Sequence, residues 1–128
     1  MFAATQRHDI APVVSQDDNV GAQGRADSHG TPMHTLYSMQ RSGNSYKVRL
    51  ALAQLGVDYR LVEVDILKGD SHTPEFLQMN PNGQVPLLEV APGRYLAESN
   101  AILWYVAGGT SLAPEDRIDR AETLQWMF

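Results

Sequence analysis

Two stretches of this sequence combine residue types that could bind a small peptide. The first contains Val85 followed by Pro86, where an apolar run typical of a buried strand begins. Proline removes the amide hydrogen that a strand would donate, so the chain at Pro86 must form an edge or a turn. A cis bond before Pro86 costs only ~0.5–1 kcal/mol, and it would turn the chain sharply and expose the N–H and C=O of Val85. An extended peptide could then pair with these two groups as an added strand.

The second stretch is Glu98-Ser99-Asn100, which directly precedes apolar residues with helical spacing. Ser99 or one of its neighbours is therefore expected to begin a helix. The first turn of a helix has free N–H groups and a partial positive charge, and both favour a small carboxylate as ligand. Each stretch alone is also compatible with plain structure, a turn before a strand in one case and a capped helix in the other. Together they predict a pocket for a short, peptide-like acid.

Composition limits the classes of function that the chain can have. Its 128 residues, 43% of them hydrophobic, are enough for one small globular domain. The net charge of −5 leaves no basic excess for phosphate contacts, so we expect no nucleic-acid partner. No apolar run reaches the ~18–20 residues that a membrane-spanning helix requires, so we expect no membrane partner either.

The absence of cysteine excludes disulfides, thiolate metal sites and Cys-x-x-Cys redox centres. Any thiol chemistry must therefore use a thiol that the substrate brings. We also expect no metal site, because the four histidines are scattered without ligand spacing: His8, His29, His34 and His72.

Residues 1–32 are rich in small and polar residues and are predicted to form a disordered N-terminal extension. They lack the basic start and apolar core of a secretory signal, and their aspartates argue against an organelle transit peptide. We expect a cytoplasmic location. Met33 stands directly before the first structured stretch, so it is a candidate for the true initiator.

The next part of the chain reads as a strand, a helix and a second strand. Residues 34–39 form the first strand, and residues 40–44 form a polar loop. Val48, Leu52 and Leu55 then lie on one face of a helix that Gly56 ends. Residues 59–66 are predicted to form the second strand. Such a unit has parallel strands with a right-handed crossover.

After this unit the sequence predicts a second, shorter helix, a hairpin and a third helix. Thr73 and Pro74 are typical of a capped helix start, and that helix ends before residue 80. Residues 86–90 and 94–96 form a hairpin, and the helix from Ser99 extends to about Ala107. The order βαβαββα indicates an α/β sandwich with a mixed four-stranded sheet for residues 33–107.

Beyond residue 107 the sequence predicts a linker at residues 108–114 and an amphipathic helix at residues 115–128. The chain ends on three large apolar residues, Trp126-Met127-Phe128, which favour contact with a partner surface. We expect this helix to be the first helix of a truncated, all-helical second domain.

Four segments in this order and spacing resemble the amino-terminal, thioredoxin-like domain of cytosolic glutathione S-transferases, of a bacterial serine-type or zeta-like kind. The resemblance covers about residues 33–107. The four segments are Leu36-Tyr37-Ser38, the stretch from Arg41 to Arg49, Asn80-Pro81-Asn82-Gly83-Gln84-Val85-Pro86, and Glu98-Ser99-Asn100-Ala101-Ile102.

The resemblance implies that the ligand is glutathione, a short peptide with two carboxylates, and that it acts as the co-substrate. The cysteinyl backbone of glutathione would pair with Val85, and its γ-glutamyl carboxylate would bind the helix start at Ser99. Glu98 would lie near the ligand's ammonium group. The implied ligand-binding residues are Asn82, Gln84, Val85, Pro86, Glu98 and Ser99.

An ordinary thiol has a pKa of ~8.5, so the protein must stabilise the thiolate for reaction near neutral pH. A hydroxyl at the start of the first helix would do so by hydrogen bonding to the anion, and the helix dipole would add to the effect. Ser42 matches the family's serine and is the first candidate. Ser45 and Asn44 are alternatives, although relatives often carry cysteine or serine at the position of Asn44. The cations of this segment are expected to be solvated or helix-capping charges: Arg41, Lys47 and Arg49.

The implied function is that of a glutathione transferase that activates the thiol for attack on an electrophilic small molecule. Full turnover would need the second domain, and the full-length protein would be a homodimer. The alternative is a non-catalytic glutathione-binding or protein-interaction module of the same fold. A thioredoxin-like or glutaredoxin-like reductase is excluded by the missing cysteine.

Overall fold

The computed structural model describes residues 33–128, and the predicted extension at residues 1–32 lies outside them. The order of the elements from β1 to α3 is βαβαββα, which confirms the predicted fold class. The elements are β1 (His34–Ser38), α1 (Gly43–Leu55), β2 (Tyr59–Glu63), the 3₁₀ helices η1 (Ile66–Lys68) and η2 (Asp70–His72), α2 (Pro74–Met79), β3 (Leu87–Ala91), β4 (Arg94–Ala97), α3 (Ser99–Ala107) and α4 (Arg117–Met127).

The four strands form one mixed sheet with the order β2-β1-β3-β4. β1 and β2 are parallel, as the crossover through α1 requires, whereas β3 is antiparallel to both β1 and β4. Leu36 pairs with Leu88 and Tyr37 with Leu87. Because side chains alternate along a strand, the first pair faces one side of the sheet and the second pair faces the other.

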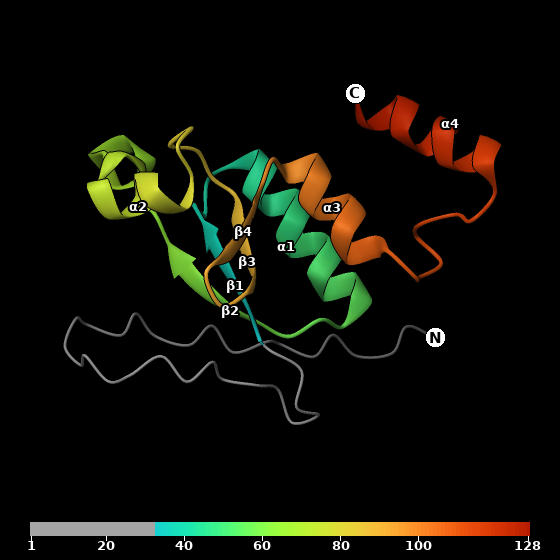
Figure 1. The fold of residues 1–128 in the computed structure, drawn as a ribbon, viewed down its shortest axis with the longest axis horizontal. Coiled ribbons are helices and arrows are strands. Elements are labelled where there is room, and N and C mark those ends of the chain that lie inside the picture. Colours follow the sequence, from blue (N-terminus) through green and yellow to red (C-terminus); the bar gives the residue numbers. More distant parts are fainter. Residues whose placement is uncertain (1–32) are drawn as a thin grey trace, which may run out of the picture.

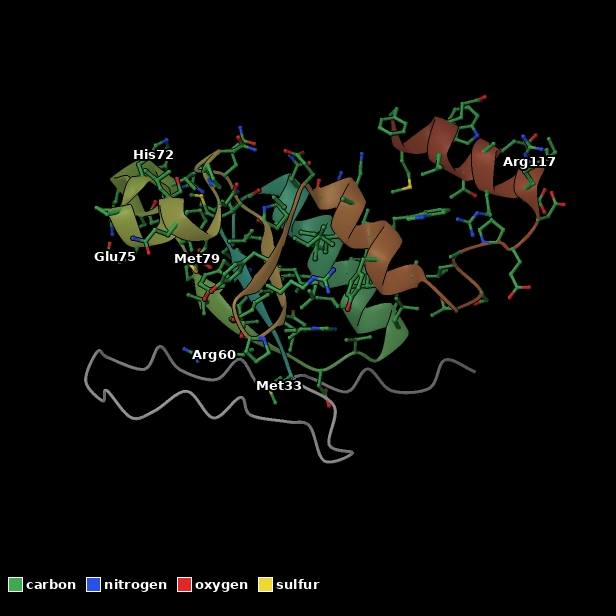
Figure 2. The ribbon with its side chains drawn as sticks, viewed as in Figure 1. Met33, Arg60, His72, Glu75, Met79 and Arg117 are labelled. Carbon is green, nitrogen blue, oxygen red and sulfur yellow. The ribbon has the colours of Figure 1, made fainter. Side chains whose placement is uncertain are left out.

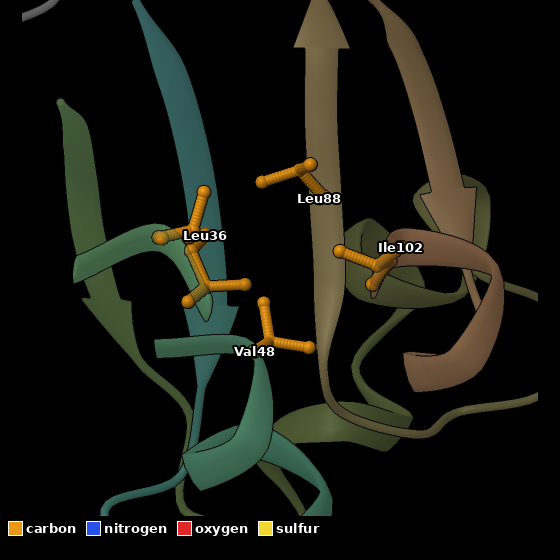
Figure 3. Packing of buried hydrophobic residues seen from close by; sticks show 5 residues of the cluster. Leu36, Val48, Leu88 and Ile102 are labelled. Atoms are coloured by element: carbon orange, nitrogen blue, oxygen red, sulfur yellow. The ribbon is translucent and has the colours of Figure 1, made fainter. Parts of the chain in front are cut away.

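Helices cover both faces of the sheet, with α1 and α3 side by side on one face and α2 on the other (Figure 1). On the first face, Leu36 and Leu88 pack against Val48 of α1 and Ile102 of α3, and all four are fully buried. Figure 3 shows these side chains converging from the two strands and the two helices. Burial of each contributes roughly 1.5–3 kcal/mol, so this cluster fixes where α1 and α3 begin relative to each other.

The start and the end of α1 follow from local sequence signals. The Ser42 hydroxyl oxygen accepts a hydrogen bond from the Ser45 amide at 3.2 Å and so caps the helix. Gly56 ends the helix in the left-handed conformation with φ 65°, and its amide donates to Ala53 and Leu52 carbonyls. The predicted glycine stop is confirmed.

The prediction that the second strand extends to residue 66 is wrong, because β2 ends at Glu63. The carboxylate of Asp65 accepts a hydrogen bond from the Leu67 amide at 3.0 Å, which begins the 3₁₀ helix η1. Ile66, whose period-two spacing suggested a strand, is instead exposed on that helix. A side chain that caps the backbone here competes successfully with strand pairing.

Helix α4 contacts α3 through polar groups. The Arg120 guanidinium lies 5.3 Å from the centre of the Trp104 ring on α3. In addition, the side-chain amide of Asn100 donates to the Met127 carbonyl.

Figure 2 places Arg117 of α4 at the opposite end of the molecule from His72 in η2. Trp126 is 85% exposed and Phe128 is fully exposed. That α4 begins a second domain stays a prediction.

None of the helices within residues 33–128 combines the length and the apolar character needed to cross a membrane.

Stability of α4 is expected to depend on pH through Asp116, the residue before its first turn. Hydrogen bonds from the Asp119 amide and then from the Ile118 amide lower the pKa of the Asp116 carboxyl below its ordinary value of 3.8. Because the folded pKa is the lower one, this contribution is present above pH 3.8 and is lost as the pH falls through the folded pKa. Circular dichroism between pH 6 and pH 2 should show a steeper loss of helix in the wild type than in Asp116→Asn, whose amide caps without titrating. Parallel pH profiles of the two proteins would contradict this.

Candidate functional site

A small, open polar cavity lies where the start of α1, the loop before β3 and the start of α3 meet. The residues that line it come from all three segments, so the two stretches singled out in the sequence do form one site. The lining residues are Asn44, Asn80, Gln84, Val85, Pro86, Glu98 and Ser99.

The loop before β3 is held by the side chain of Asn80, which is only 3% exposed. Its amide nitrogen donates to the Gln84 carbonyl at 2.9 Å, and its amide oxygen accepts from the Asn82 amide at 3.2 Å. This clamp shapes the loop that presents Gln84 to the cavity. The Asn82 side chain is exposed, and Asn82 does not line the cavity. Asn80 was not among the predicted site residues, although asparagine in an Asn-Pro-Asn-Gly run is a known signal for such turns.

Gly83 lets this loop pack closely against the preceding 3₁₀ helix. Its φ is +61°, and a Cβ atom added there would lie 2.9 Å from His72 Nε2 and 3.1 Å from the Ser71 carbonyl oxygen. Any other residue at this position would therefore push the loop away from η2 and disturb the cavity wall.

The peptide bond between Val85 and Pro86 is cis, as predicted. Pro86 is buried, and both residues line the cavity. Neither the N–H nor the C=O of Val85 forms a hydrogen bond with another group of residues 33–128. A buried or half-buried backbone group that lacks an internal partner needs water or a ligand, so Val85 offers one donor and one acceptor to a peptide in the cavity.

The start of α3 forms the opposite wall, and it is open to an anion. Ser99 is the first residue of the helix, and no side chain caps its first turn. Side-chain oxygens do cap the other α-helices of the described chain, namely Ser42 for α1, Thr73 for α2 and Asp116 for α4. The first-turn N–H groups of α3 and the positive end of its dipole are therefore available to a carboxylate.

Glu98, the residue before this helix, has a backbone conformation that residues other than glycine rarely adopt. Its φ is +67° and its ψ is 117°, and it is the one non-glycine residue with positive φ in the described part of the chain. Such a conformation costs of order 1–3 kcal/mol and persists where the surrounding structure requires it. Its carboxylate is exposed, and it is the one charged group among the cavity-lining residues of the described part of the chain.

The three candidates for thiol activation occupy different environments at the start of α1. Ser45 is fully buried, and its hydroxyl oxygen accepts from the Met39 amide at 3.4 Å. Ser42 is half-buried; its hydroxyl oxygen caps the helix, and its hydroxyl hydrogen is still available to donate. Asn44 is exposed and lines the cavity, which Ser42 and Ser45 do not.

Arg49 positions the segment that leads into α1. Its guanidinium donates to the Ser38 hydroxyl at 2.6 Å, to the Met39 carbonyl at 3.2 Å and to the Gln40 carbonyl at 3.0 Å. The expectation that Arg49 is a solvated or helix-capping charge is therefore wrong, because it bridges β1 and the turn that follows. Three contacts to one turn favour the planar, five-donor guanidinium over lysine.

None of the tyrosines within residues 33–128 lines the cavity. Tyr37, the nearest in sequence to the turn before α1, lies on the α2 face of the sheet in edge contact with Phe76 and Tyr95. Burial, followed by the charge of Glu89, raises the pKa of Tyr37 above 10.0. No cluster of histidine, aspartate and glutamate side chains within residues 33–128 is arranged to hold a metal ion.

Comparison with known proteins identifies the family. The family model for the glutathione S-transferase N-terminal domain matches residues 32–108, which include β1 to α3 and the whole cavity. The chain belongs to this family. The Escherichia coli protein named disulfide-bond oxidoreductase YfcG is 40% identical over 92 residues, which cover 66% of this chain and 43% of that protein.

Solved structures of glutathione S-transferases are also similar. A possible glutathione S-transferase from Rhodopseudomonas palustris is 77% identical with a TM-score of 0.73, over 75% of this chain and 47% of that one. A glutathione transferase homologue from Sulfitobacter, solved with bound glutathione, is 32% identical with a TM-score of 0.68, over 74% of this chain and 47% of that one. The chain thus spans less than half the length of each of these relatives.

The backbone of Glu98 can be tested with a pair of variants. Glu98→Ala and Glu98→Gly both remove the carboxylate, but only glycine adopts positive φ without steric cost. We expect Glu98→Gly to be more stable than Glu98→Ala by about 1 kcal/mol in urea unfolding at equilibrium. An alanine variant as stable as the glycine variant would show that the conformation at residue 98 carries no strain.

Proposed function

We propose that this glutathione S-transferase domain binds glutathione in the cavity between the loop before β3 and the start of α3. The observation that carries the proposal is the pair of unpartnered backbone groups on opposite walls, those of Val85 and those of the first turn of α3 at Ser99. One wall suits a peptide backbone and the other suits a carboxylate, and glutathione has both. The bound glutathione in the Sulfitobacter homologue supports this ligand.

The proposed orientation follows from the chemistry of each wall. The γ-glutamyl carboxylate accepts hydrogen bonds from the first-turn N–H groups at Ser99 and from its hydroxyl. Its ammonium group lies beside the Glu98 carboxylate, and the cysteinyl N–H and C=O pair with Val85 as a short antiparallel strand. The Gln84 side chain is exposed at the cavity and can donate to the ligand's remaining polar groups, and Asn82 lies further out on the same loop.

This orientation directs the sulfur of glutathione toward the start of α1. Asn44 lines the cavity there and carries an amide that can donate to the thiolate, while Ser42 has one hydroxyl hydrogen to donate. We assign the donor role to Asn44 first and to Ser42 second, because Asn44 is the one in contact with the cavity. Ser45 is the least suitable of the three, since it is fully buried.

The reaction that this arrangement supports is nucleophilic attack by the thiolate on an electrophilic small molecule. The sulfur forms a bond to the electrophilic carbon, and the leaving group departs with the electron pair of the broken bond. Donors at the start of α1 lower the pKa of the thiol and thereby raise the thiolate fraction at neutral pH. Activity of this kind belongs to the whole protein, for which we also propose a cytoplasmic location and a homodimer.

The similarity to YfcG favours a second candidate function, which is thiol–disulfide exchange between glutathione and a disulfide substrate. The chain has no cysteine, so all three reacting sulfurs would have to come from bound ligands. The thiolate of glutathione would attack one sulfur of the disulfide and release the other as a thiolate. The same donor at Asn44 would serve both reactions, and turnover of a chromogenic electrophile compared with that of a small disulfide would distinguish them.

Binding is the first prediction of this proposal. Isothermal titration calorimetry should detect glutathione binding at millimolar or lower concentration, and S-methylglutathione should also bind because it keeps both carboxylates and the peptide backbone. Ser99→Ala should weaken both ligands about tenfold, since it removes a hydrogen bond to a charged group. No heat of binding at millimolar glutathione would refute the proposal and favour the protein-interaction module instead.

Activation of the thiol is a separate prediction. In Asn44→Ala, the pKa of the thiol of bound glutathione should rise by about one unit, equivalent to ~1.4 kcal/mol, because the thiolate loses one hydrogen-bond donor. Ultraviolet absorbance of the thiolate against pH measures this value. Gln54→Ala, an exposed amide on the same helix, is the matched control and should leave it unchanged.

Ser42 requires a variant that keeps the helix cap. Ser42→Asn preserves an oxygen acceptor for the Ser45 amide, so it tests the hydroxyl rather than the stability of α1. A rise in thiol pKa in Ser42→Asn, with none in Asn44→Ala, would transfer the donor role to Ser42.

A further inference from the structure

The two helix starts that form the walls of the cavity are joined by a direct hydrogen bond. Lys47 Nζ on α1 donates to Asn100 Oδ1 on α3 at 2.7 Å, and both side chains are half-buried. Lys47 is one turn beyond Asn44, and Asn100 directly follows Ser99. The contact therefore joins residues that are close in the chain to the residues that line the cavity.

This bond supplements the apolar packing at the point where that packing ends. Val48 and Ile102 hold α1 and α3 together within the core. Toward the helix starts, Lys47 directly precedes Val48 and Asn100 lies two residues before Ile102, and the bond between Lys47 and Asn100 links the helices there. A bond from an ammonium group to an amide oxygen is stronger than one between neutral groups, so it limits relative movement of the two starts.

The charge of Lys47 also suits the proposed ligand. Glutathione has two carboxylates and one ammonium group, and reaction adds a thiolate. None of the cavity-lining residues in the described part of the chain is cationic, and the one charged side chain among them is the Glu98 carboxylate. The Lys47 ammonium, bonded to the residue after Ser99, adds positive charge next to the anion-binding turn, where partial exclusion of water increases its effect.

We infer that Lys47 is a positioning residue, which acts through Asn100 to hold the start of α3 at the distance from α1 that glutathione requires. The inference rests on the proposed function, since it concerns affinity for glutathione. It gives Lys47 a role in ligand affinity that differs from the solvated or capping charge expected from the sequence.

The test compares glutathione affinity in four proteins by isothermal titration calorimetry. Lys47→Met keeps the length of the side chain but removes the charge and the donor, so the Kd should increase about fivefold. Lys47→Arg should restore most of the affinity. Lys68→Met is the matched control, because Lys68 is the other lysine of the chain and is 79% exposed beside Asp65. It should leave the Kd within twofold of wild type.

A double-mutant cycle shows whether Lys47 acts through Asn100. Asn100→Ala also loses its bond to the Met127 carbonyl, so its own Kd carries a second effect that the cycle removes. If the inference is correct, Lys47→Met increases the Kd much less in the Asn100→Ala background than in the wild type, and only the charge effect of the ammonium remains. Independent effects of the two substitutions would overturn it.

Hydrogen exchange gives a readout that does not depend on glutathione. The Ile102 amide donates to the Glu98 carbonyl at 2.9 Å and closes the first turn of α3. Its exchange should accelerate in Lys47→Met and remain unchanged in Lys68→Met. A lower melting temperature with unchanged Kd would identify a merely structural role for Lys47 and overturn the inference.

The outcomes separate the two proposals. Absence of glutathione binding by the wild type refutes the proposed function, and the affinity role of Lys47 is refuted with it. Normal binding by the wild type together with unchanged binding by Lys47→Met refutes the inference about Lys47 alone.

Discussion

The central constraint in this structure is the presence of unpaired backbone groups on two facing walls of a polar cavity. On one wall the N–H and C=O of Val85 have no partner within residues 33–128, and on the other the first turn of α3 has no side-chain cap. Backbone groups in folded proteins are nearly always satisfied, and caps stabilise helices by ~0.5–2 kcal/mol. A protein that leaves both walls unsatisfied loses stability that a ligand can restore on binding.

The rest of the fold fixes the positions of these two walls relative to each other. The cluster that includes Leu36, Val48 and Ile102 fixes α1 and α3 on one face of the sheet. Asn80 holds the loop that ends in the cis bond, and Arg49 holds the turn that leads into α1. The cavity therefore depends on a rigid arrangement of short polar clamps around an apolar core, which is how binding sites reach a defined geometry before the ligand arrives.

The features predictable from the sequence are those governed by residues close together in the chain. The order of elements follows from hydrophobic periodicity, the end of α1 from Gly56, and the helix start at Ser99 from polar residues before an apolar run. The cis bond at Pro86 could be proposed because proline at a strand start permits few alternatives. Local rules failed at β2, where the cap from Asp65 ended the strand early.

Contacts between distant segments could not be derived in the same way. Lys47 and Asn100 are 53 positions apart, and nothing in either sequence neighbourhood indicates that they meet. Similarly, the sequence could not decide which of Ser42, Asn44 and Ser45 faces the cavity, because the answer depends on how α1 rotates against the sheet. That rotation is set by the packing of Val48 and Leu52 in the core.

A crystal structure of the protein with glutathione would show whether the ligand pairs with both sets of backbone groups. In that structure the γ-glutamyl carboxylate should bind the first-turn N–H groups of α3, and the cysteinyl backbone should form two hydrogen bonds with Val85. The sulfur would then lie next to the Asn44 amide. Glutathione bound elsewhere, or bound in this cavity with the Val85 groups still unpaired, would contradict the proposed binding mode.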